Sequence, residues 1–271
     1  MKYLYTSVAS IIWFTGTFLS GVSAKSIICE LCDLRYEIYH SKNLANSNLK
    51  GSYLYGADFT RADVTSTNFG SANLIFSKFV RSDLSNVILT NADLTKSNLF
   101  GATVRKAVGK FTNFSGAYLE AAELTDADFS GAKFINAKLI SSFSDRTNFS
   151  NADMRNVVFE NCFCNRANFS GADLRGANFS KADLRMANFS GANIEGATFN
   201  KAQMDYARLL SVRGRMSKFV STSLLGANLK GADFSGADFT DATLASTLQQ
   251  NTNFCNSRKP DGTVSVCDKS K

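Results

Sequence analysis

The side chains that could do covalent or metal chemistry in this sequence are six cysteines and a single histidine. Cys29 and Cys32 form a Cys-x-x-Cys motif, which occurs in redox-active pairs and as half of a zinc site. No second such motif and no group of histidines accompanies it, and the surrounding pattern lacks the strand–helix–strand context of thioredoxin-like proteins. We therefore expect Cys29 and Cys32 to form a structural disulfide in an N-terminal cap.

The other ingredients of an active site are missing from the sequence pattern. His40 is the only imidazole, and no nucleophile is paired with a base. The sequence contains no Gly-rich phosphate loop and no cluster of metal-ligand residues. Serine and aspartate are abundant, but they recur in a five-residue repeat, which accounts for their number without a catalytic role. The sequence therefore predicts a protein that is not an enzyme, with no cofactor, no catalytic residue and no metal site.

The first 24 residues predict a secretory signal peptide. Lys2 gives a positive start, residues 8–19 are apolar, and the Val-Ser-Ala sequence that ends at Ala24 fits the small-x-small cleavage pattern. The apolar stretch is short for a membrane span, although an uncleaved anchor is the alternative. Cleavage would lower the formal charge from +7 to +6, because Lys2 is lost. We expect no membrane span after cleavage.

A five-residue repeat dominates the rest of the chain. When each unit is numbered by its central apolar residue, i, the centres recur at every fifth position from Leu44 to Phe254 without insertion or deletion. Of these 43 centres, 38 are Leu, Phe, Ile, Val or Met, and the exceptions are Gly109, Ser144, Cys164, Gly214 and Gln249. The residue at i−2 is small in 42 of the 43 units, and i−1 is frequently Asp or Asn. Each unit therefore offers one large and one small side chain to an interior.

A period of five fits neither an α-helix, with a period of about 3.6, nor a flat strand, with a period of about 2. It favours a coil that turns a corner after every unit, with the large residue filling the interior and the small one letting the walls approach. Asn, Asp and Gly near the corners tolerate tight-turn geometry.

The pattern, written ANFSG-ADLRG-ANFSK from Ala167, resembles the pentapeptide-repeat family over residues 44–254 and more weakly back to Cys29. The resemblance implies an all-β fold, a right-handed four-sided β-helix with four units per coil and about eleven coils. At a period of 20 residues, the centres from Phe59 to Phe239 are all Phe or Leu, which would form a continuous ladder in the core. We expect four segments: a signal peptide (1–24), an N-terminal cap with irregular repeats (25–43), the solenoid (44–254) and a C-terminal tail (255–271).

The tail resembles that of exported bacterial members of the family, with a Cys-Asn start, a Pro-Asp-Gly turn and a closing cysteine. This resemblance implies a disulfide between Cys255 and Cys267 that closes a hairpin over the last coil. Cys162 and Cys164 occupy i−2 and i of one unit, so both should point inward. We expect them to be small buried hydrophobic residues, with a Cys-x-Cys disulfide as the alternative.

Regular solenoid surfaces favour binding over catalysis. The candidate partner surface consists of outward apolar residues near the N-terminal end, which the 20-residue period puts on two adjoining faces: Tyr53, Tyr55, Ile75, Phe76, Val80 and Phe100. Scattered surface apolar residues are the alternative. The sequence thus predicts a scaffold in the bacterial periplasm or outside the cell, monomeric or homodimeric, with an unknown protein partner.

A second candidate surface is basic. It consists of an outward column with one neighbour, which could hold an anionic ligand or surface: Arg155, Arg175, Arg213 and Arg215. Local pairing with Asp153, Asp173 and Glu195 is the favoured alternative. Some members of the family resemble duplex DNA and act on DNA gyrase, a role that needs an acidic cytoplasmic rod. This rod is basic and carries a predicted export signal, so we expect neither that role nor a nucleic-acid partner.

Signal cleavage has a spectroscopic consequence, because Trp13 is the only tryptophan and lies in the predicted signal. The exported protein should therefore show tyrosine fluorescence and no tryptophan emission. A tryptophan signal from the mature product would mean that the N-terminal segment is retained.

Overall fold

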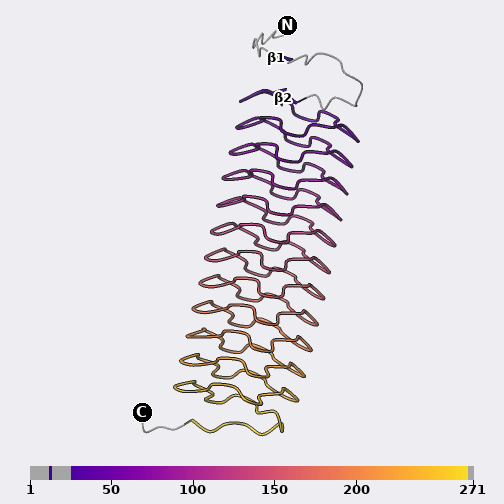
Figure 1. Ribbon diagram of the computed structural model, residues 1–271. Helices are drawn as coiled ribbons and strands as arrows, with labels where there is room; N and C mark the ends of the chain where they lie inside the picture. The colour runs from indigo at the N-terminus through magenta and orange to yellow at the C-terminus, as the bar shows by residue number, and fades with distance from the viewer. Residues whose placement is uncertain (1–11, 14–25, 268–271) are drawn as a thin grey trace.

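The computed structural model describes residues 12–13 and 26–267, which form an elongated stack of coils (Figure 1). Two short strands, β1 (Ile12–Trp13) and β2 (Ile27–Ile28), pair antiparallel at the N-terminal end. Within these ranges no helix is long and apolar enough to cross a membrane. The remainder of the predicted signal peptide, including its cleavage site, lies outside the described residues.

The coils repeat every twenty residues. Parallel bridges join each i−1 residue to its equivalent one coil later, from Ile28 with Asn48 to Asp238 with Arg258. Four five-residue units therefore close one turn, as the repeat predicts. The regular pairing already begins at Ile28, so residues 28–43, where we expected an N-terminal cap with irregular repeats, form most of a regular first coil.

The backbone N–H groups of a unit are all used, as the unit from Asp58 to Ala62 illustrates. The N–H groups of Asp58, Phe59 and Arg61 donate to carbonyls of neighbouring coils at 2.9, 2.7 and 2.9 Å. The N–H of Ala62 donates to the carbonyl of Phe59 at 2.8 Å and closes the corner. The remaining N–H, of Thr60, donates to the side chain of Asp58 at 2.9 Å.

This last bond explains why Asp and Asn recur at i−1. The i+1 N–H points to no neighbouring carbonyl, and an Asx side chain two residues earlier accepts it locally. The same bond recurs in most units with Asp or Asn at i−1, for example at Gly70, Ser170 and Ser235. The i−1 residue thus satisfies a donor that the coil itself leaves unpaired.

Each corner contains a residue with a left-handed backbone. Every i+2 residue from Leu31 to Asn256 has a positive φ, and only 12 of these residues are glycine. The other 34 include Arg, Lys and Phe, for which this conformation costs on the order of 1 kcal/mol each. The coil-to-coil bond made by the i+2 N–H, from Leu31 to Asp241, offsets that cost.

Phenylalanine ladders fill the core. Phe159, Phe179 and Phe199 stack at centroid separations of 5.1 and 5.2 Å, with nearly parallel rings. Phe169 and Phe189, on a neighbouring wall, stack at 4.9 Å and meet Phe179 edge to face. All five rings are fully buried.

Two of the exceptions among the centres are explained by this packing. A Cβ added at Gly109 would lie 2.5 Å from the Phe129 ring, and one added at Gly214 would lie 2.5 Å from the Phe234 ring. The ring from the next coil therefore occupies the space that a side chain would need.

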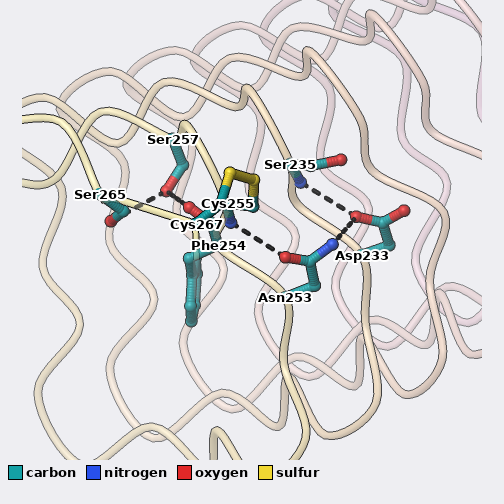
Figure 2. Close-up of a disulfide and its surroundings, with 8 residues drawn as sticks. All are labelled: Asp233, Ser235, Asn253, Phe254, Cys255, Ser257, Ser265 and Cys267. Carbon is teal, nitrogen blue, oxygen red and sulfur yellow. Dashed lines mark hydrogen bonds between the residues drawn. A yellow bond between two sulfur atoms is a disulfide. The ribbon is translucent and has the colours of Figure 1, made fainter. Parts of the chain in front are cut away.

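A hairpin closes the C-terminal end. Arg258 bridges Val264 in antiparallel fashion, and a disulfide joins Cys255 to Cys267 (Figure 2). The Asn253 side chain accepts the N–H of Cys255 at 3.0 Å and donates to Asp233 in the coil before at 2.9 Å. The tail is thus tied to the solenoid through side chains as well as the backbone.

The remaining cysteines also form disulfides, Cys29 with Cys32 and Cys162 with Cys164. The buried Cys162–Cys164 pair differs from our expectation of two separate thiols. Both side chains point inward from one short strand, at a Cα separation of 5.8 Å that allows a disulfide.

Phe179→Ala should lower the free energy of unfolding by about 3–5 kcal/mol, because it leaves a cavity in both ladders. Phe111→Ala is the matched control, since Phe111 is 65% exposed at a corner. It should change stability by about 0.5 kcal/mol or less. Denaturant unfolding of both variants measures the difference, and equal losses would contradict the described core.

Tyr39 introduces an alkaline dependence of stability. Burial, with a smaller effect of the Glu37 charge, raises the pKa of Tyr39 to about 12. Because the folded-state pKa is raised, the stabilisation is complete below about pH 10, the unfolded value, and is lost as the pH rises toward 12. Tyrosinate absorbance during alkaline unfolding should show this loss, and Tyr39→Phe should reduce it.

Candidate interaction surfaces

Three aromatic residues from successive coils pack together at one corner near the N-terminal end. Tyr36 meets Tyr55 with ring centroids 5.5 Å apart, and Tyr55 meets Phe76 at 5.6 Å, both edge to face. The ammonium group of Lys96, one coil further, lies 5.6 Å from the centroid of the Phe76 ring. We call Tyr36, Tyr55 and Phe76 the aromatic corner.

The aromatic corner is exposed yet held in place. Tyr36 is 67% exposed and Phe76 is 45% exposed. The Tyr36 ring lies against Gly56, where an added Cβ would be 2.8 Å from it. Tyr36 was missed by the sequence analysis because it precedes the first firm centre. The five-residue phase extends back to Leu34, and it places Tyr36 at i+2 of that unit, in the same column as Phe76.

The predicted apolar surface is divided between two corners. Tyr53 and Ile75 are neighbours of the aromatic corner in the sequence. Tyr53 lies two residues before Tyr55, and Ile75 directly precedes Phe76. Val80 and Phe100 belong to the next corner along each coil, beyond the strands that carry Lys78 and Asn98. The six predicted residues therefore lie at or beside two successive corners of neighbouring coils.

The predicted arginine column is largely neutralised by aspartates. The guanidinium groups of Arg155 and Arg175 each donate two hydrogen bonds to the aspartate two residues earlier, at 2.6 to 2.8 Å. Arg215 binds Asp233 at 2.7 Å instead of Glu195. The hydrogen bond from Arg175 holds the pKa of Asp173 below its usual value. In the described part of the chain, Arg213 makes no ion pair.

A second aromatic feature was not predicted. Phe143 and Phe163 stack on the outside of the rod with centroids 5.0 Å apart and planes inclined by 4°. They are 46% and 48% exposed. We call them the phenylalanine pair.

The interior beneath the phenylalanine pair is built from small residues. Ser142 and Ser144 flank Phe143 and point inward, with their hydroxyls 3.4 Å apart. The Cys162–Cys164 disulfide flanks Phe163 in the same way. In most units the large apolar residue points inward and the i−1 residue that points outward is polar. In these two successive coils the large apolar residue points outward and small residues point inward. The sequence signal was the two exceptional centres, Ser144 and Cys164, which lie 20 residues apart and each follow a Phe.

The structure also allows a test of catalytic geometry. The His40 ring is 3.0 Å from the Ser41 hydroxyl on an exposed corner. The nearby Asp58 carboxylate accepts the Thr60 N–H and makes no hydrogen bond to His40 within the described ranges. The hollow between the last coil and the tail is lined by neutral residues and the Cys255–Cys267 disulfide. Over residues 12–13 and 26–267, no group of acidic, His and Cys side chains could hold a metal ion.

Sequence models of pentapeptide repeats match most of the solenoid. A model of eight repeat copies matches residues 43–74, 67–105 and 217–248, and a model of the pentapeptide repeat region matches 112–189 and 142–209. The chain belongs to the pentapeptide-repeat family. No curated protein matches the sequence of this pentapeptide-repeat protein.

Solved structures of similar proteins include HetL, a pentapeptide repeat protein involved in heterocyst differentiation regulation in the cyanobacterium Nostoc sp. strain PCC 7120. It has a TM-score of 0.65 and 24% identity, over 86% of this chain and 93% of that one. The similarity confirms the predicted right-handed four-sided β-helix and concerns the fold alone. A trypsin-treated form of QnrB1, a plasmid-mediated fluoroquinolone resistance protein, has a TM-score of 0.43 and 20% identity over 65% and 91% of the chains.

Proposed function

We propose that this pentapeptide-repeat protein is a non-catalytic scaffold that binds a protein partner through the aromatic corner, in the periplasm or outside a bacterial cell. The observation that carries the proposal is the edge-to-face packing of Tyr36, Tyr55 and Phe76 on three hydrogen-bonded coils. Exposed aromatic rings that are already fixed lose little conformational freedom on binding. Tyr side chains are also enriched among the residues that dominate binding energy.

The surroundings of the aromatic corner indicate the chemistry of the partner. Lys96 lies against the Phe76 ring and makes no ion pair within the described residues. Arg35, beside Tyr36, is already paired with Asp33 at 2.6 Å. A partner that packs apolar side chains against the exposed sides of the rings and presents a carboxylate to Lys96 would match both features.

Two observations support export. The N-terminal sequence has the features of a signal peptide. All six cysteines form disulfides in the structure. Disulfides persist in oxidising compartments such as the periplasm.

The alternative function is the binding of an anionic ligand by the arginine column. The structure supports it less well than partner binding through the aromatic corner. Three of the column's four guanidinium groups already have aspartate partners. An anion would have to displace these contacts, and exposed charges are screened by salt. A DNA-mimicking role fits less well still, because the chain has a formal charge of +7.

Replacing Tyr55 and Phe76 with Ser should weaken partner binding at least about tenfold, since both rings leave the contact area. The matched control replaces Val80 and Phe100 with Ser, in neighbouring positions at the next corner. Crosslinking of the protein in its own compartment identifies the partner, and titration of the purified partner measures affinity for each variant.

Replacing Arg155, Arg175 and Arg215 with Gln should change that affinity little at physiological salt. Loss of binding in this variant, with binding retained by the aromatic variant, would identify the basic column as the site. Equal affinities for the aromatic variant and its control would exclude the aromatic corner.

A further inference from the structure

The phenylalanine pair lies at the centre of an ordered arrangement of charges. In its column, Glu123 precedes Phe143 by one coil and Asp183 follows Phe163 by one coil. Arg105 approaches Glu123 at 3.4 Å and Arg185 approaches Asp183 at 2.6 Å. An apolar centre with a polar rim is the usual anatomy of a protein interface. We call the face from Thr103 to Gln203 that carries this column the phenylalanine face.

The corner that follows the phenylalanine face carries charged residues on both sides of the midpoint between Phe143 and Phe163. Residues at equal distances from this midpoint, one towards each end of the rod, can be compared in sign. One coil outward from each ring, Asp126 on one side corresponds to Arg185 on the other. At the level of the rings themselves, Asp145 corresponds to Arg166. Two coils outward, Lys106 corresponds to Asp205. Each of these three correspondences joins opposite charges at corners that lie a whole number of coils apart. Arg146 also corresponds to Arg166 at the level of the rings, and that contact joins like charges.

The charged residues that make no ion pair within the rod carry the argument. Within the described residues, Lys106, Asp145, Arg166 and Asp205 make no ion pair. The comparison about the midpoint matches these four residues with one another. Asp126, in contrast, is already bound by Arg146 at 2.6 Å. The corner that precedes the face follows the same rule, since Glu120 corresponds to Lys181.

We propose that the phenylalanine face binds a second copy of this chain, with the two rods antiparallel and a two-fold axis crossing the face between Phe143 and Phe163. A two-fold interface is self-complementary, so every contact occurs twice. Phe143 of one copy then packs on Phe163 of the other, and the two Asp145–Arg166 contacts border the aromatic centre. Glu123 of one copy lies opposite Asp183 of the other, and each of these acids is paired with an arginine of its own chain. Lys106 and Asp205 make the outermost pair of contacts.

The parallel arrangement of two rods gains no net attraction from the same charges. A two-fold axis along the rod would bring the two corners of the face together at the same level. Asp126 would then meet Glu120, and Arg185 would meet Lys181. Arg166 would meet Glu160 and Asp205 would meet Lys201, so like and opposite charges balance in the parallel arrangement. Opposite charges outnumber like charges only in the antiparallel arrangement, which is therefore selected.

The expected affinity is modest. Six coils at about 4.8 Å span about 25 Å along the rod, which places the contact at the low end of interface sizes. A dissociation constant in the micromolar range follows for such an area with two stacked aromatic contacts. The contact lies on other coils than the aromatic corner, so the two surfaces can be tested separately.

Sedimentation of the purified protein over a range of concentrations tests the proposal. The unmodified protein should dimerise, and the variant with Phe143→Ser and Phe163→Ser should weaken dimerisation at least about tenfold. The matched control carries Ile88→Ser and Val108→Ser, two residues at i−1 on successive coils of another face, each 40% exposed. The control should dimerise normally. Thermal unfolding checks that both variants are folded.

Charge reversal tests the antiparallel geometry. Arg166→Asp alone places two acids together, and Asp145→Arg alone places two bases together, so each variant should dimerise at least about tenfold more weakly. An equimolar mixture of the two variants should dimerise again, because the arginine introduced in one variant would then face the aspartate introduced in the other. Asp is well tolerated at the positive φ of position 166.

Three results would overturn the proposal. The first is an unmodified protein that stays monomeric at about 100 μM, far above the expected dissociation constant. The second is a dimer that survives both the phenylalanine and the charge variants, which would indicate association through another surface such as a rod end. The third is a mixture of the two charge variants that fails to restore the dimer.

Discussion

Parallel hydrogen bonding between coils twenty residues apart is the constraint on which the rest of this structure depends. The N–H groups of i−1, i and i+2 donate to neighbouring coils, and the turn and the Asx side chain satisfy the other two. Because an unpaired buried backbone group costs about 1–3 kcal/mol, a unit with one residue more or fewer would disturb every coil beyond it. The unbroken five-residue phase from Leu44 to Phe254 follows from this requirement.

The same bonds set the spacing of side chains both inside and outside the rod. Buried rings such as Phe179 and Phe199 stack at 5.2 Å, and the exposed rings of Phe143 and Phe163 stack at 5.0 Å. The backbone imposes this separation. Aromatic residues in an outward column therefore stack on one another in the same way as those in an inward column. A surface of this kind is preorganised for binding, since its side chains are already ordered before a partner arrives.

Charges on the rod fall into two groups with different consequences. Arg155 and Arg175 are bound by aspartates of their own units, and such exposed pairs contribute little to stability or to long-range attraction. Lys106, Asp145 and Arg166 lack such partners in the described chain and border the phenylalanine pair. Specific recognition is therefore better served by the second group, because no existing ion pair has to be broken first.

The sequence by itself determined the fold class, the inward positions i and i−2, and the columns that recur every 20 residues. It could do so because these features follow from local spacing along one chain. It did not determine that Arg215 binds Asp233, that Cys162 binds Cys164, or that Tyr36 completes the aromatic corner. Those contacts depend on the direction of each corner side chain and on its distance from the adjacent coil. Only the tertiary structure fixes these two quantities, because the repeat assigns a residue to a column but leaves several neighbours within reach of its side chain.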